Sequence, residues 1–174
     1  MKKINRFFEG TFKKEYFFME GEIDLDSKSL IEKIQTGIKD PSNKNDITNV
    51  NGGMTDWQYF MNDPEIGEII VNILNEIEQQ VALPKYKIHE VWGIEIGFAG
   101  STKQHNHSPC VFSAIIYLND VEQILYFPQI KKEVKTTRGK FVIFSGDLDH
   151  YTHRNLTHTK KYAIVFNSKI IKGF

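Results

Sequence analysis

The sequence is poor in the features that mark several common classes of protein. It has a single cysteine, Cys110, so it contains neither a disulfide framework nor a zinc site built from several cysteines. Lys plus Arg and Asp plus Glu both total 22, so there is no excess basic field for binding nucleic acid non-specifically. The net charge therefore gives no indication of a nucleic-acid partner.

Long apolar runs are also missing. No uninterrupted apolar stretch approaches the ~18 residues that a membrane span needs. Residues 1–6 are basic, but the apolar run of a signal peptide does not follow them. We expect no membrane partner and a soluble protein of the cytoplasm.

The composition fits one folded domain. Of the 174 residues, 40% are hydrophobic and 25% are charged, which is enough for a buried core. No repeat, low-complexity tract or linker divides the chain. We expect a single domain, 1–174, in which 1–85 form N-terminal strands and supporting helices and 86–170 form a β-rich core with the site.

The N-terminal part predicts two short strands and a helix. Aromatic residues crowd positions 7–22 and are interrupted by two glycines, which is typical of paired strands. Asp26 or Ser27 can cap a helix whose apolar residues recur at helical spacing until Pro41.

A loop and a second helix follow. Residues 41–53 are polar and rich in glycine, which favours a loop. Asp63, Pro64 and Glu65 then give a capping acid, a proline in the first turn and an acid at the positive end of the helix dipole. The apolar stripe of this helix predicts that it packs on a sheet.

From residue 86 onward the sequence predicts one strand after another. The predicted strands cover 87–98, 111–118, 124–127, 140–145 and 161–167. This density of short strands indicates a mainly β (α+β) fold, with a closed barrel or sandwich whose outer face carries the two helices.

Three of the six histidines form the pattern that carries the most chemistry. Side chains two residues apart in a strand point to the same face, so His105 and His107 can present their imidazoles side by side. A third imidazole, from His150, completes a set that leaves coordination positions open, as a catalytic metal needs. These three histidines are the candidate catalytic metal ligands.

Strand parity predicts which other side chains face this site. If the pleat continues from residue 105 past Pro109, four residues share the face of the histidines: Val111, Ser113, Ile115 and Tyr117. In the last strand, Lys161 and Asn167 alternate with small apolar residues, which fits a polar, ligand-lined interior. The alternative is that Lys161 continues Lys160 as an edge charge.

Five segments follow one another in a characteristic order: His-Asn-His at 105–107, Phe-Ser-Ala-Ile-Ile-Tyr-Leu-Asn at 112–119, Leu-Tyr-Phe-Pro at 125–128, the run 139–150, and Lys-Tyr-Ala-Ile-Val-Phe-Asn at 161–167. In order and spacing, residues 92–168 resemble the iron(II)- and 2-oxoglutarate-dependent oxygenases. The resemblance is to the compact prolyl-hydroxylase-like members of phages and bacteria, and it covers a little under half of the chain. It implies a double-stranded β-helix, or jelly-roll, core, and the host cytoplasm if a phage encodes the chain.

The resemblance also implies a role for each site residue. The three histidines would hold iron(II), Lys161 would pair with the far carboxylate of 2-oxoglutarate, and Tyr117 would donate a hydrogen bond to it. We add Asn167 and Ser113 to the set that binds the co-substrate. The implied reaction consumes dioxygen and 2-oxoglutarate, releases succinate and CO₂, and hydroxylates a C–H bond of an unknown substrate, by analogy a peptide or protein proline.

His107 departs from the commonest pattern of this family, in which that position carries Asp or Glu. The net charge of the site would be zero with three neutral imidazoles, Fe²⁺ and 2-oxoglutarate with two negative charges. A carboxylate ligand in place of one imidazole would leave a net charge of −1. Three histidines are also a known ligand set for zinc. The nearby acids Asp147, Asp149 and Glu95 are candidates to reach the metal or to orient an imidazole.

Two alternatives remain open. One is a cupin-like metalloprotein with the same three histidines, a dioxygenase or isomerase that needs no 2-oxoglutarate. The other is a catalytically silent structural or binding protein of a phage particle. The remaining histidines, His89, His153 and His158, are expected near the surface, and Cys110 is expected to pack as a small apolar residue.

Overall fold

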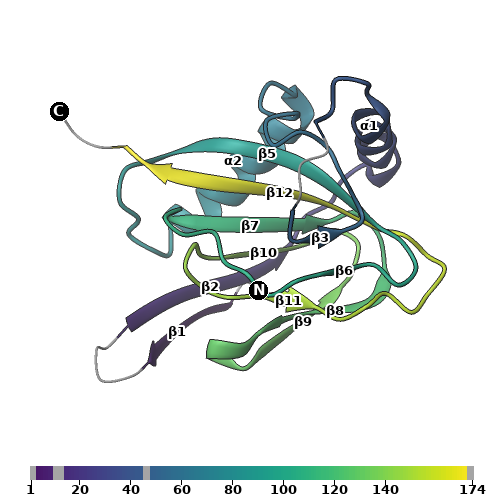
Figure 1. The fold of residues 1–174 in the computed structure, drawn as a ribbon. Helices are drawn as coiled ribbons and strands as arrows, with labels where there is room; N and C mark the ends of the chain where they lie inside the picture. Colours follow the sequence, from purple (N-terminus) through teal and green to yellow (C-terminus); the bar gives the residue numbers. More distant parts are fainter. Residues whose placement is uncertain (1–2, 10–13, 45–47, 172–174) are drawn as a thin grey trace.

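Figure 1 shows the computed structural model, which describes residues 3–9, 14–44 and 48–171. Most of the described strands belong to one antiparallel sheet with the order β1 (Lys3–Glu9), β2 (Lys14–Glu22), β10 (Lys140–Ser145), β7 (Phe112–Tyr117), β12 (Lys161–Ile170), β5 (Tyr86–Ile96) and β4 (Gly53–Met54). The minor sheet has the order β11 (Tyr151–Thr152), β8 (Val121–Phe127) and β9 (Lys132–Thr136). A short pair joins β3 (Val50–Asn51) to β6 (Ser101–Thr102), and η1 (Pro128–Ile130) follows β8.

Two helices cover one face of the large sheet (Figure 1). In α1 (Ser27–Lys39), the side chain of Asp26 accepts hydrogen bonds from the backbone N–H groups of Lys28 and Ser29, so Asp26 is the N-cap. In α2 (Pro64–Glu78), Asp63 caps the backbone N–H of Ile66, and the proline occupies the first turn as predicted. None of the described helices is long and apolar enough to cross a membrane.

The large sheet separates two apolar cores because its side chains alternate between its faces. One core lies under the helices and includes Ile34, Ile73, Ile143 and Phe166. The second core lies between the two sheets and includes, from the large sheet, Ile94, Ile115, Tyr117, Val142, Phe144, Ala163 and Val165, and, from the minor sheet, Leu125, Phe127 and Val134. The predicted alternation of the last strand is therefore confirmed, because Ala163 and Val165 face inward.

The structure corrects several predictions of local structure. Residues 41–53 are not entirely a loop, because β3 and the first residue of β4 lie there. The short strands β6, β9 and β11 are absent from the sequence-based prediction. Ile115 and Tyr117 share the inner face as expected, but Val111 packs against the helix-side core. The reason is a turn in which the N–H of Cys110 donates to the carbonyl of His107 at 2.8 Å, which resets the strand phase before β7.

Two glycines provide a matched test of this packing. Gly67 lies exposed in α2, and a Cβ added to it would have no atom within 4 Å, whereas a Cβ on Gly146 would overlap the backbone carbonyl of Cys110. We expect Gly67→Ala to raise the free energy of unfolding by about 0.5–1 kcal/mol. Gly146→Ala should lower it by about 1–3 kcal/mol through overpacking. Urea unfolding monitored by circular dichroism measures both, and equal effects would contradict the close approach.

Candidate metal centre

Three histidines converge where the ends of several strands meet. One ligand nitrogen from each of His105, His107 and His150 lies within 4.8 Å of the other two. The ring centroids of His105 and His150 are 4.4 Å apart, and that of His107 lies 5.0 and 5.1 Å from them. The sequence pattern therefore identified a set of side chains that the fold brings together.

Backbone hydrogen bonds hold this arrangement. His105 and His150 form an isolated antiparallel bridge, in which the N–H of His105 donates to the carbonyl of His150 at 3.1 Å and the reverse bond measures 2.9 Å. The N–H of His107 donates to the carbonyl of Gly146 at 2.6 Å. The main-chain positions of the three histidines are thus tied together by backbone hydrogen bonds.

The histidines are neutral and two of them have a defined tautomer. Burial lowers the pKa of all three imidazoles: that of His107 falls to about 3, and that of His150 lies well below its ordinary value. Nδ1 of His105 lies 2.8 Å from the carbonyl oxygen of Lys103, and Nδ1 of His150 lies 3.2 Å from that of Leu148. A carbonyl only accepts, so each Nδ1 carries the proton and each Nε2 keeps a free lone pair.

This donor set fits a divalent transition metal. Neutral imidazoles suit iron, zinc, copper and nickel, and three of them leave positions open for other ligands. Aromatic rings line one side of the group: the centroid of Phe144 is 4.8 Å from that of His150, and Phe127 and Trp92 lie 5.7 and 6.2 Å from His150 and His107 respectively. His150 is buried, whereas His105 and His107 are partly exposed, and desolvation is the main cause of the lowered pKa values of all three imidazoles.

Lys161 lies in the interior and is not an edge charge. It is 2% exposed, and it shares the inner face of β12 with Ala163 and Val165. Within the part of the chain that the structure describes, its ammonium group forms no ion pair or hydrogen bond. Burial alone lowers the pKa of Lys161 to about 7. A buried cation without a partner is costly, so this side chain is suited to receive an anion.

Other polar groups on the inner face also lack partners. Ser113 and Asn167 lie opposite each other on β7 and β12, and both Oγ of Ser113 and Oδ1 of Asn167 are buried with no hydrogen-bond partner among the described residues. Tyr117 is fully buried beside Thr136, and burial raises the pKa of its hydroxyl. Unsatisfied buried polar atoms are rare in proteins, and a bound ligand is one common explanation.

The other acidic candidates do not reach the metal group. Glu95 accepts hydrogen bonds from Lys160 at 2.8 Å and Tyr162 at 2.7 Å, and Tyr162 belongs to the helix-side core, so Glu95 does not face inward. Asp149 instead accepts hydrogen bonds from the side chains of Gln104 and Asn106. No carboxylate of the described residues, Asp147 included, belongs to the three-histidine group.

The remaining histidines and the cysteine match their predicted places in part. His153 and His158 are exposed as expected, whereas His89 is only 25% exposed, with its Nε2 3.6 Å from Glu90. Cys110 is half-buried, and burial raises the pKa of its thiol, which makes it a poor nucleophile. Glu90 was missed entirely: its carboxylate accepts a hydrogen bond from Asn167, and nothing in the local sequence points to this contact.

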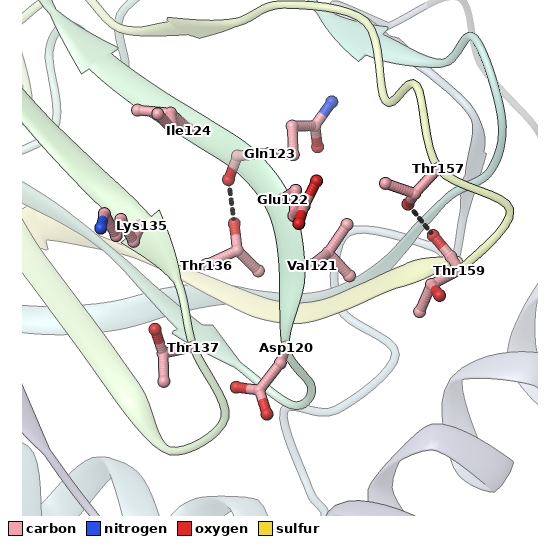
Figure 2. Close-up of a pocket in the computed structure, with 10 residues that line it drawn as sticks. All are labelled: Asp120, Val121, Glu122, Gln123, Ile124, Lys135, Thr136, Thr137, Thr157 and Thr159. Carbon is pink, nitrogen blue, oxygen red and sulfur yellow. Dashed lines mark hydrogen bonds between the residues drawn. The ribbon is translucent and has the colours of Figure 1, made fainter.

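Residues of β8, β9 and the segment 157–159 line a cavity of about 640 Å³. Figure 2 shows these side chains. None of the ten residues that line the cavity is a histidine. Thr136 in its wall donates to the backbone carbonyl of Gln123 at 2.6 Å and is also hydrogen-bonded to Tyr117. The cavity is thus separate from the histidines and lies behind the tyrosine.

The fold resembles that of known oxygenases. A viral collagen prolyl hydroxylase from Paramecium bursaria Chlorella virus-1, solved with 2-oxoglutarate, is 16% identical, with a TM-score of 0.64 over 87% of this chain and 96% of the viral one. HygX from Streptomyces hygroscopicus, with nickel and 2-oxoglutarate bound, is 12% identical. Its TM-score is 0.67, and the match covers 88% of this chain and 82% of HygX. A Pseudomonas putida prolyl-4-hydroxylase is 12% identical, with a TM-score of 0.62 over 89% and 93%. These likenesses confirm the jelly-roll fold.

No protein-family model and no curated protein matches the sequence of this chain.

Lys161 gives a testable dependence of stability on pH. Its pKa lies near 10.5 in the unfolded chain and at about 7 in the fold, so between these values the unfolded state binds more protons. Stability therefore rises as pH increases from about 7 towards 10.5, and it is lowest where Lys161 is charged in both states. We expect Lys161→Met to be more stable than the parent by roughly 3–5 kcal/mol at pH 7 and to lose this rise.

Urea unfolding of the metal-free protein between pH 6.5 and 9.5 measures the effect. Lys160→Met is the control, because Lys160 is 53% exposed and paired with Glu95, and this variant should keep the rise. If the free energy of unfolding changes with pH in the same way in the parent and in Lys161→Met, Lys161 is not buried as described.

Proposed function

We propose that this protein is an iron(II)- and 2-oxoglutarate-dependent oxygenase that hydroxylates a C–H bond. The observation that carries the proposal is the combination of a three-histidine group with a buried lysine that has no partner among the described residues and faces the core between the two sheets. The presence of 2-oxoglutarate in the structures of the viral hydroxylase and HygX supports it.

His105, His107 and His150 would hold the metal. Two of them already present Nε2 lone pairs, because their Nδ1–H groups are engaged by backbone carbonyls. When bound, iron(II) supplies dioxygen activation and a Lewis-acid site for the keto acid. The chain itself positions the ligands, and Phe144, Phe127 and Trp92 provide an apolar wall beside His150 and His107.

Lys161 would bind the far carboxylate of 2-oxoglutarate. An anion beside it favours the charged ammonium and so raises its pKa from about 7, which means that Lys161 takes up a proton on binding above that pH. Tyr117 lies on the neighbouring strand, opposite Ala163 of β12. Its hydroxyl is hydrogen-bonded to Thr136, and on binding of the co-substrate it would exchange this bond for one to the same carboxylate. The unpaired Oγ of Ser113 and the amide of Asn167 would contact the polar atoms near the metal.

For the substrate we propose a peptide or protein proline. The support is analogy with two structural neighbours, the viral collagen prolyl hydroxylase and the bacterial prolyl-4-hydroxylase. Fold likeness alone does not specify a substrate, so the proposal concerns the class of molecule only.

An anaerobic titration with iron(II) and 2-oxoglutarate tests the site. We expect a weak visible charge-transfer band in the parent protein and none in His150→Ala. Lys161→Ala should need at least about tenfold more 2-oxoglutarate, because it lacks a charge-assisted bond. His153→Ala is the matched control: this histidine is exposed and close in sequence to His150, and its loss should leave the band intact.

Other outcomes separate the alternatives. Metal binding without the band, and oxygen consumption without succinate, would refute the 2-oxoglutarate mechanism and favour the cupin-like metalloprotein. A protein that binds neither iron nor zinc would refute both and favour a structural or binding role.

A further inference from the structure

The surroundings of His107 differ from those of the other two histidines. Nδ1 of His105 and Nδ1 of His150 face backbone carbonyls, whereas Nδ1 of His107 lies 3.3 Å from Nδ2 of Asn167. Asn167 is 4% exposed, and its Oδ1 has no partner. The third histidine is therefore held by a side-chain amide, a group that can present either a donor or an acceptor.

Glu90 decides which end of this amide faces His107. Nδ2 of Asn167 donates to Oε2 of Glu90 at 2.9 Å. A carboxylate accepts hydrogen bonds and cannot donate them, so the NH₂ end of the amide has to lie toward it. Turning the amide over would bring its oxygen against the carboxylate oxygen. The hydrogen bond to Glu90 thus fixes Nδ2 of Asn167 in the position where it also contacts Nδ1 of His107.

Glu90 and Asn167 are directly opposite each other in the sheet, and they are the last pair before an irregularity. Along β12 and β5, Asn167 lies opposite Glu90, but Ser168 lies opposite Ile88, so His89 is an extra residue in β5. Such a bulge changes the direction of neighbouring side chains. Nε2 of His89 lies 3.6 Å from the same Oε2 of Glu90, so the carboxylate is flanked on two sides.

We propose that Glu90, acting through Asn167, fixes the tautomer of His107 and so controls when this histidine joins the metal. An amide N–H that faces Nδ1 requires a lone pair there, which places the proton of the neutral ring on Nε2. Neither nitrogen of His107 then has a free lone pair, whereas His105 and His150 each keep one on Nε2. Coordination by His107 requires Asn167 to turn or withdraw, so two ligands are ready and the third is held back.

This inference deepens the proposed function and concerns the same metal site, but its first test needs no metal. Nitrogen chemical shifts of ¹⁵N-histidine-labelled, metal-free protein report the tautomer of each ring. We expect His107 to carry its proton on Nε2 in the parent. In Glu90→Gln it should shift toward the Nδ1–H form, because the Gln amide can donate to Oδ1 of a turned Asn167.

Glu95→Gln is the matched control for this measurement. Glu95 is also a partly buried carboxylate of β5, but it is hydrogen-bonded to Lys160 and Tyr162 away from the histidines. This variant should leave the tautomer of His107 unchanged. An Nδ1–H form of His107 in the parent, or no difference between the parent and Glu90→Gln, would overturn the proposal.

A second measurement follows the consequence for metal binding. In Asn167→Leu the amide is gone, so we expect cobalt(II) to bind about fivefold more tightly, the equivalent of one hydrogen bond that no longer has to be broken. If Asn167 merely supports the ligand, its loss should instead weaken binding by about 10- to 100-fold, and this result would overturn the proposal. Melting curves of the metal-free variants check that they are folded.

Failure of the proposed function gives a different pattern. If cobalt(II), iron(II) and zinc(II) all fail to bind the parent, the oxygenase is refuted, while the chemical shifts still decide whether Glu90 sets the tautomer of His107.

Discussion

The site depends on one pair of backbone hydrogen bonds, those between His105 and His150. They join two segments that are far apart in sequence, and residues directly opposite in an antiparallel pair project to the same side. The two imidazoles are therefore brought together by the same kind of bonding that builds the sheets. His107 is added by its own backbone bond to Gly146. The main chain thus defines the spacing of the candidate metal ligands.

Burial gives these groups their chemical character. It keeps the imidazoles neutral, so that lone pairs remain for a metal, and it lowers the pKa of Lys161 until a proton is held only weakly. The same interior leaves Ser113 and Asn167 with unpaired polar atoms. Burial of Lys161 costs stability at pH values where its ammonium group would be charged, which is the feature from which an anion site was proposed.

Local patterns predicted much of this fold correctly. The caps at Asp26 and Asp63 and the alternation along β12 were readable, because each depends on residues a few positions apart. The predictions failed where long-range pairing overrides local preference. The glycine-rich segment 41–53 contains β3 because Val50 pairs with Thr102, and β11 exists because Tyr151 pairs with Tyr126. Val111 was misplaced because a turn at Cys110 resets the phase.

The sequence by itself determined the β-rich class, the starts of the two helices and the residue types of the candidate metal site, since spacing and capping are properties of neighbouring residues. Only the tertiary structure decided that Glu95 lies with Lys160 and Tyr162 and that Glu90 meets Asn167. Both carboxylates lie on β5, five positions apart, so strand alternation places them on opposite faces of the sheet. Which of the two faces inward is set by the pairing of β5 with β12, whose partner segment lies far away in the chain.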